Sequence, residues 1–123
     1  MRLPFTAFAA LLCIAMPAAA QTPITPYESQ LLRLAEVLGS LHFLRRLCND
    51  AEGPVWRNAM ASILAAEKPD PARAGRLTAR FNRGFQAFSR TYSTCTPAAV
   101  RASGLYQAEG VRLTSQIVSR YAR

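Results

Sequence analysis

The sequence predicts an all-α protein, a small four-helix bundle that follows a cleaved signal peptide and is linked by one disulfide. Three observations lead to this fold class. Apolar residues recur at steps of three and four, and no run alternates with period two. A residue that favours helix starts precedes a proline four times. Two cysteines remain after the N-terminal segment, an even number that favours a disulfide in an exported chain.

Residues 1–20 have the order of a secretory signal peptide, with one cation, a short apolar run and small residues at 18–20. We expect cleavage after Ala20, which leaves residues 21–123 as a single helical domain in the periplasm. The apolar run is too short to span a bilayer, so we expect no transmembrane anchor. A lipoprotein acylated at Cys13 is the alternative, but Leu12 stands where a small residue is needed.

The first predicted helix, Tyr27–Cys48, is the element that the rest of the chain is expected to cover. Thr25 is its predicted N-cap, and Glu28 completes a capping box in which each side chain accepts a backbone N–H bond. The expected apolar face consists of Leu31, Leu34, Ala35, Leu38, Leu41, His42 and Leu44. The opposite, polar side consists of Ser29, Arg33, Glu36 and Ser40.

Three further helices are predicted at about 54–67, 71–94 and 97–121, each starting at a proline that sets φ for a helix. Apolar residues at helical spacing form the expected core face of each. In the second helix they are Trp56, Met60, Ile63 and Leu64. In the third they are Leu77, Phe81, Phe85, Phe88, Tyr92 and Cys95. In the fourth they are Val100, Tyr106, Leu113, Ile117 and Tyr121, with Ser103, Gly104 and Gly110 allowing a neighbour to approach closely.

Short connections predict antiparallel neighbours, so the first and third helices end at the same end of the bundle. Cys48 ends the first helix and Cys95 ends the third. We therefore expect a Cys48–Cys95 disulfide, with two separate buried thiols as the alternative.

The basic charge is concentrated in the second half of the chain. Residues 71–123 contain nine arginines and one acid, Glu109. The candidate anion-binding residues share one stripe of the third helix: Arg73, Arg76, Arg80, Arg83 and Arg90. Like charges on one stripe repel, and an anionic partner removes that cost. Because the chain is expected to be exported, we do not expect nucleic acid as the partner of this stripe. The expected partner is an anionic envelope component or an acidic periplasmic protein. The alternative is that the stripe is only a solvated surface.

Catalytic and metal-binding patterns are weak. His42 is the single histidine, and the sequence has no spaced set of metal ligands and no nucleophile elbow. We therefore expect no catalytic residue, no metal and no cofactor.

Several motifs together resemble a set of small exported proteins of alphaproteobacterial type that are classified as a domain of unknown function. They are the run from Tyr27 to Cys48, Trp56-Arg57, Phe81-Asn82-Arg83-Gly84-Phe85 and Tyr92-x-x-Cys95-Thr96. The resemblance implies a single exported domain in a Gram-negative envelope and assigns no activity. The matching positions are Glu36, His42, Arg45, Cys48, Trp56, Asn82, Arg83 and Cys95.

We expect a non-catalytic periplasmic binding or envelope-maintenance protein that uses the basic helical surface. One alternative is a small periplasmic enzyme or enzyme inhibitor with a polar cleft formed by Glu36, His42 and Asn82. The other is a structural homodimer, and the sequence leaves the oligomeric state open. The contact surface of such a homodimer would consist of Ser103, Gly104 and Gly110 together with the outward-facing Leu32, Phe43 and Leu47.

Overall fold

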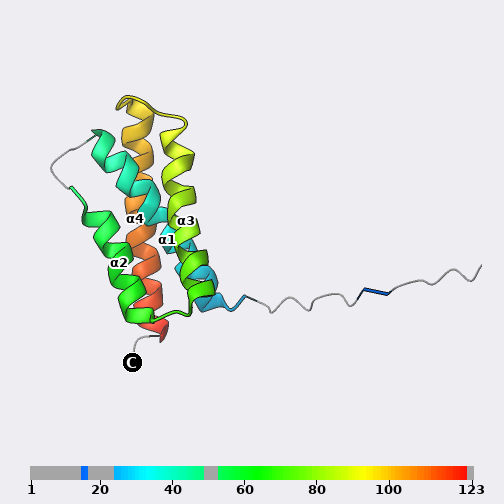
Figure 1. Cartoon of the computed structure of the whole chain (residues 1–123). Helices are drawn as coiled ribbons and strands as arrows, with labels where there is room; N and C mark the ends of the chain where they lie inside the picture. The colour runs from blue at the N-terminus through cyan, green and yellow to red at the C-terminus, as the bar shows by residue number, and fades with distance from the viewer. Residues whose placement is uncertain (1–14, 17–23, 49–52, 122–123) are drawn as a thin grey trace, which may run out of the picture.

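Four helices in up-and-down order form the computed structural model (Figure 1), which describes residues 15–16, 24–48 and 53–121. They are α1 (Pro26–Cys48), α2 (Val55–Glu67), α3 (Pro71–Ser89) and α4 (Pro97–Tyr121). No strand occurs among these residues, so the predicted all-α fold class is confirmed. The predicted signal peptide lies outside the described residues except for 15 and 16.

Side-chain caps at three helix starts explain why the chain turns into helix at those points. The hydroxyl or carboxylate oxygens of Thr25, Asp70 and Thr96 each accept the backbone N–H three residues later, at 3.2, 2.8 and 3.1 Å. The expected capping box is incomplete. The carboxylate of Glu28 accepts hydrogen bonds from Arg73 of α3 and so joins two helices.

Helix α1 is the centre of the bundle, because each of the other three helices packs mainly on it. The expectation of one polar side is therefore wrong at Ser40, which is 1% exposed and donates its hydroxyl to the carbonyl of Glu36 at 2.9 Å. Leu32, expected to face outward, is also buried. Because three helices pack around α1, its polar residues do not have to lie on one continuous solvent-facing side.

Two glycines bring the backbones of α1 and α3 into direct contact. A Cβ atom on Gly39 would lie 1.8 Å from the carbonyl oxygen of Phe81, and one on Gly84 would lie 2.0 Å from the carbonyl oxygen of Glu36. Only residues without a Cβ fit such a crossing. The α1–α3 interface is therefore built on backbone contact, with Leu77 and Phe81 buried beside it.

Helix α3 is shorter than expected and ends at Ser89, where Arg90 is its C-cap. Tyr92 and Cys95 thus lie in the connection to α4. The predicted disulfide is confirmed: Cys48 is bonded to Cys95, with their Cα atoms 5.0 Å apart. It joins the end of α1 to the segment that leads into α4.

The core face of α4 differs in part from the predicted one. Val100 is 55% exposed and Tyr121 is 40% exposed, because the face on α1 is rotated toward Ala99, Ser103, Gly110 and Leu113. A Cβ on Gly110 would lie 3.3 Å from Val37 of α1, whereas one on Gly104 would meet no atom within 4 Å. Ser103 and Gly110 therefore pack inside the domain and cannot form the predicted homodimer seam.

Candidate functional site

The first arginine of the predicted stripe, Arg73, lies inside a network between three helices. Its guanidinium contacts Glu28 of α1 at 2.7 Å and Glu67 of α2 at 2.9 Å. Tyr27 donates its hydroxyl to the same Glu67 carboxylate. The hydrogen bonds that Arg73 donates to these carboxylates raise the pKa of Arg73, and burial together with Glu67 raises the pKa of Tyr27 to about 12. Arg73 thus links α1, α2 and α3 and is not an open cation.

Arg80 is paired as well. Its guanidinium lies 3.4 Å from Glu36, which also contacts Arg33 at 3.5 Å. Arg33 in turn donates two parallel hydrogen bonds to Glu109 of α4, the shorter at 2.8 Å, and these bonds raise its pKa. This second network joins α1 to both α3 and α4.

The remaining members, Arg76, Arg83 and Arg90, form an open row on α3. All three are exposed, and no carboxylate among the described residues lies within ion-pair distance of them. Steps of seven residues return to almost the same side of a helix, about 10 Å further along its axis. The row therefore presents three guanidinium groups to solvent over roughly 20 Å.

His42 is 7% exposed and lies beside the rings of Phe81 and Phe85, each with its centroid 5.8 Å away. Its Nδ1 atom is buried and has no hydrogen-bond partner among the described residues. Burial lowers the pKa of His42, and the charges of Arg46 and Arg57 lower it further. A neutral imidazole is therefore favoured at this position.

The hollows found among the described residues do not bring the three residues of the predicted polar cleft together. His42 lines a hollow of about 270 Å³ with Arg46, Gly53, Pro54 and Arg57. Glu36 pairs with arginines on the other side of α1, and Asn82 is exposed on α3. The structure therefore places His42 beside cations and apart from the predicted acid and amide.

The described residues contain no metal-ligand cluster and no membrane-spanning helix. No group of three or more His, Cys, Asp or Glu side chains there is placed to hold a metal ion. None of the described helices is both long and apolar enough to cross a bilayer.

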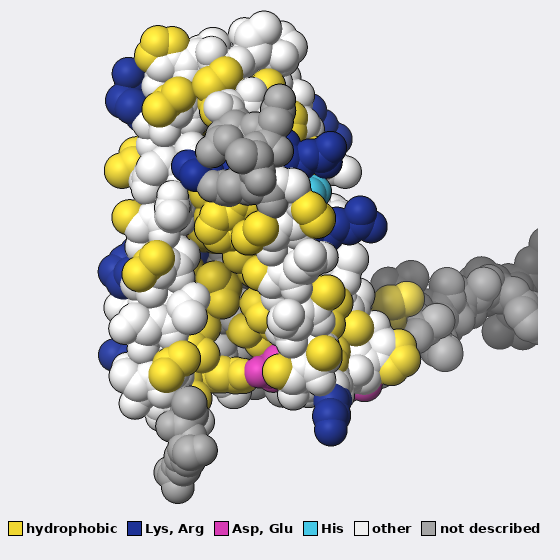
Figure 2. All heavy atoms as spheres, turned by 90° about the vertical axis from the view of Figure 1, so that its left-hand side faces the viewer, with side chains coloured by type: hydrophobic (Ala, Val, Ile, Leu, Met, Phe, Trp, Pro, Cys, Tyr) yellow, Lys and Arg dark blue, Asp and Glu magenta, His cyan; other side chains and the backbone are white. Residues whose placement is uncertain are grey.

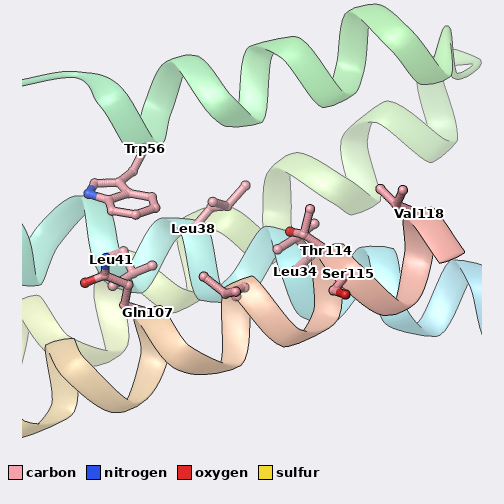
Figure 3. A pocket seen from close by; sticks show the side chains of 10 residues that line it. Leu34, Leu38, Leu41, Trp56, Gln107, Thr114, Ser115 and Val118 are labelled. Carbon is pink, nitrogen blue, oxygen red and sulfur yellow. The ribbon is translucent and has the colours of Figure 1, made fainter.

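The sequence analysis missed an apolar pocket of about 430 Å³ between α2 and α4, with α1 as its floor. Figure 2 shows it as a hollow with hydrophobic side chains between two ridges. In Figure 3, Trp56 extends from α2 over the leucines of α1, and Thr114 and Val118 of α4 lie toward the other end. The sequence contains a signal for this pocket. In α4, the residues that line it recur at steps of three and four, one position after the residues that pack on α1.

These features define a disulfide-linked helical domain with an exposed arginine row and an apolar pocket. The chain belongs to the family described as "Protein of unknown function (DUF2385)", which matches residues 26–121 and so spans all four helices. This match confirms the expected domain-of-unknown-function family. Comparisons with curated proteins and with solved structures found no match.

Proposed function

We propose that this protein is a non-catalytic binding protein of the bacterial envelope, which docks on an anionic envelope component through Arg76, Arg83 and Arg90. The observation behind the proposal is the separation of the predicted stripe into two kinds of arginine. Arg73 and Arg80 are neutralised by carboxylates of α1 and α2. The other three are left together on one exposed line.

An open row of this kind suits an extended anionic surface. Three like charges on one helix face destabilise the free protein slightly, and phosphate or carboxylate groups on a partner reverse that effect. Each basic residue near an anionic lipid surface contributes about 1 kcal/mol. Three therefore contribute about 3 kcal/mol, or roughly a hundredfold in affinity.

The location in the envelope rests on the N-terminal segment, whose order of charge, apolar run and small residues is that of a signal peptide. The confirmed disulfide is consistent with an oxidising compartment such as the periplasm.

The test is co-sedimentation of oxidised protein, residues 21–123, with phosphatidylglycerol vesicles and with purified cell-wall fragments at low and high salt. We expect pelleting at low salt that is lost at high salt, because exposed charges are screened. Replacing the row by glutamine should weaken binding about a hundredfold. A control with the same loss of charge carries glutamine at three arginines of α4: Arg101, Arg112 and Arg120.

The control should weaken binding by only a few fold, since its arginines lie on another helix. Equal loss in both variants would show that net charge alone drives binding and would contradict a dedicated row. A protein that stays in the supernatant with both materials at both salts would overturn the docking proposal.

A further inference from the structure

Helix α4 has two seams of heptad-like spacing, and only one of them is covered. The covered seam packs on α1 and consists of Ala99, Ser103, Tyr106, Gly110, Leu113 and Ile117. The open seam is displaced by one residue and consists of Val100, Gly104, Gln107, Val111, Thr114 and Val118, all exposed. Steps of four and three residues keep each seam on one side of the helix. This is the spacing of the residues through which one helix packs against another.

The open seam forms one wall of the apolar pocket. The pocket's floor is Leu34, Leu38 and Leu41 of α1, which also follow steps of four and three, and its second wall includes Trp56 of α2. A second hollow of about 190 Å³ shares Leu34 and continues the floor to Tyr27. The two hollows together extend along the bundle for about four helical turns, or roughly 20 Å of α1.

Two exposed arginines lie along the α4 edge of this groove, and the acid Glu67 lines only the smaller hollow, where it pairs with Arg73. No charged residue lines the larger pocket. Helical spacing places Arg101 and Arg112 along the outer edge of the open seam, and both are exposed. They are eleven residues apart, so they lie about three turns from each other on nearly the same side of the helix. The neighbouring acid, Glu109, lies 2.8 Å from Arg33 of α1 and 4.0 Å from Arg112, whose side chain is still 63% exposed.

We propose that the groove between α2 and α4 receives an amphipathic α-helix of a partner protein, with an apolar seam flanked by acidic residues. The apolar seam fills the groove over Leu38 and beside Trp56, and the acidic flank pairs with Arg101 and Arg112. A second copy of this basic chain lacks the required flank, since like charges oppose its approach. This surface is separate from the arginine row of α3, so the proposal stands independently of the proposed function.

The test uses Trp56, the chain's single tryptophan, as a reporter inside the groove. The probe is a designed 24-residue helical peptide with leucine at a and d positions and glutamate at e and g. We expect saturable binding with a blue shift of Trp56 emission. A peptide with lysine at e and g should bind at least tenfold more weakly, and one with the same composition but a scrambled seam should give no shift.

Variants of the protein locate the bound helix. Val111→Glu and Val118→Glu should each weaken the peptide at least tenfold, because they place a charge in the open seam. Ala79→Glu is the matched control, since Ala79 is exposed on α3, which lines neither hollow of the groove, and it should stay within twofold of wild type. All three positions are exposed, so circular dichroism should show unchanged helix content.

Three results would overturn the proposal. Equal weakening by Ala79→Glu and Val111→Glu would show that the peptide does not occupy the seam. A Trp56 shift with laurate and none with any peptide would assign the groove to an acyl chain. Sedimentation equilibrium showing a dimer that Val111→Glu dissociates, with no peptide binding, would assign it to a second copy.

Discussion

Replacing Gly39 by alanine tests the backbone contact between α1 and α3, on which the bundle is built. Alanine is the better helix former by about 1 kcal/mol, so the substitution would stabilise an open helix. At this crossing the new Cβ would lie 1.8 Å from the carbonyl oxygen of Phe81, and real Cβ contacts essentially never fall below 3.0 Å. The two helices must therefore separate by at least about 1.2 Å at this point, the difference between those distances.

The cost follows from the side chains packed at the same interface. Phe43 of α1 contacts Phe85 of α3, and Leu77 and Phe81 are buried nearby. Burial of each such side chain contributes about 1.5–3 kcal/mol, and a gap of about 1 Å removes a quarter to a half of the contact energy. Four side chains then lose about 1.5–6 kcal/mol. After the gain in helix propensity of about 1 kcal/mol, Gly39→Ala should destabilise the domain by about 0.5–5 kcal/mol.

Urea unfolding of oxidised protein, followed by circular dichroism and by Trp56 fluorescence, measures this difference. Gly84→Ala should behave like Gly39→Ala, since its Cβ would lie 2.0 Å from the carbonyl oxygen of Glu36. Gly104→Ala is the matched control, because its Cβ would meet no atom within 4 Å. The control should gain about 0.5–1 kcal/mol.

The reasoning is refuted if Gly39→Ala and Gly84→Ala both unfold within about 0.5 kcal/mol of wild type while Gly104→Ala shows its gain. That result would mean that α1 and α3 do not approach to glycine contact. If neither interface variant folds, the direction of the prediction holds, and Gly39→Ser should fail in the same way.

Removing the disulfide with Cys48→Ala and Cys95→Ala together should lower the free energy of unfolding by about 4 kcal/mol, since the closed loop spans a separation of 47 residues. Urea midpoints compared with reduced wild type check this, because reduction should reproduce the loss. Tyr27→Phe should cost about 1–2 kcal/mol by losing the bond to Glu67, and should abolish an ionisation near pH 12 in ultraviolet titration. Because its folded pKa is raised from 10.0, this contribution is present below about pH 10 and is lost as the pH rises through 12. His42, with its pKa lowered, should titrate below 6.5 in proton NMR. Wild type should therefore lose stability as the pH falls from 6.5 through the lowered pKa of His42, because the folded state resists protonation of the ring. The His42→Leu variant should lack this pH dependence. A His42 ring that titrates above 6.5 would contradict its burial.

Local signals were sufficient for the helices and for the disulfide. Thr25, Asp70 and Thr96 each accept the cap bond that their place before a proline indicated. The alternating direction of the helices then brought Cys48 to Cys95. The end of α3 was overestimated by five residues, since the aromatic spacing continues to Tyr92 after the helix has ended.

The sequence by itself thus determined where the helices start, which residues recur at helical spacing and which two cysteines pair. It could do so because caps, proline geometry and periodicity act within a few residues. Which side of each helix is covered was decided only by the tertiary structure. Three neighbours cover most of α1, carboxylates of other helices neutralise Arg73 and Arg80, and the pocket between α2 and α4 leaves Val111 open. Each of these outcomes depends on residues far apart in the chain, so no local pattern contains it.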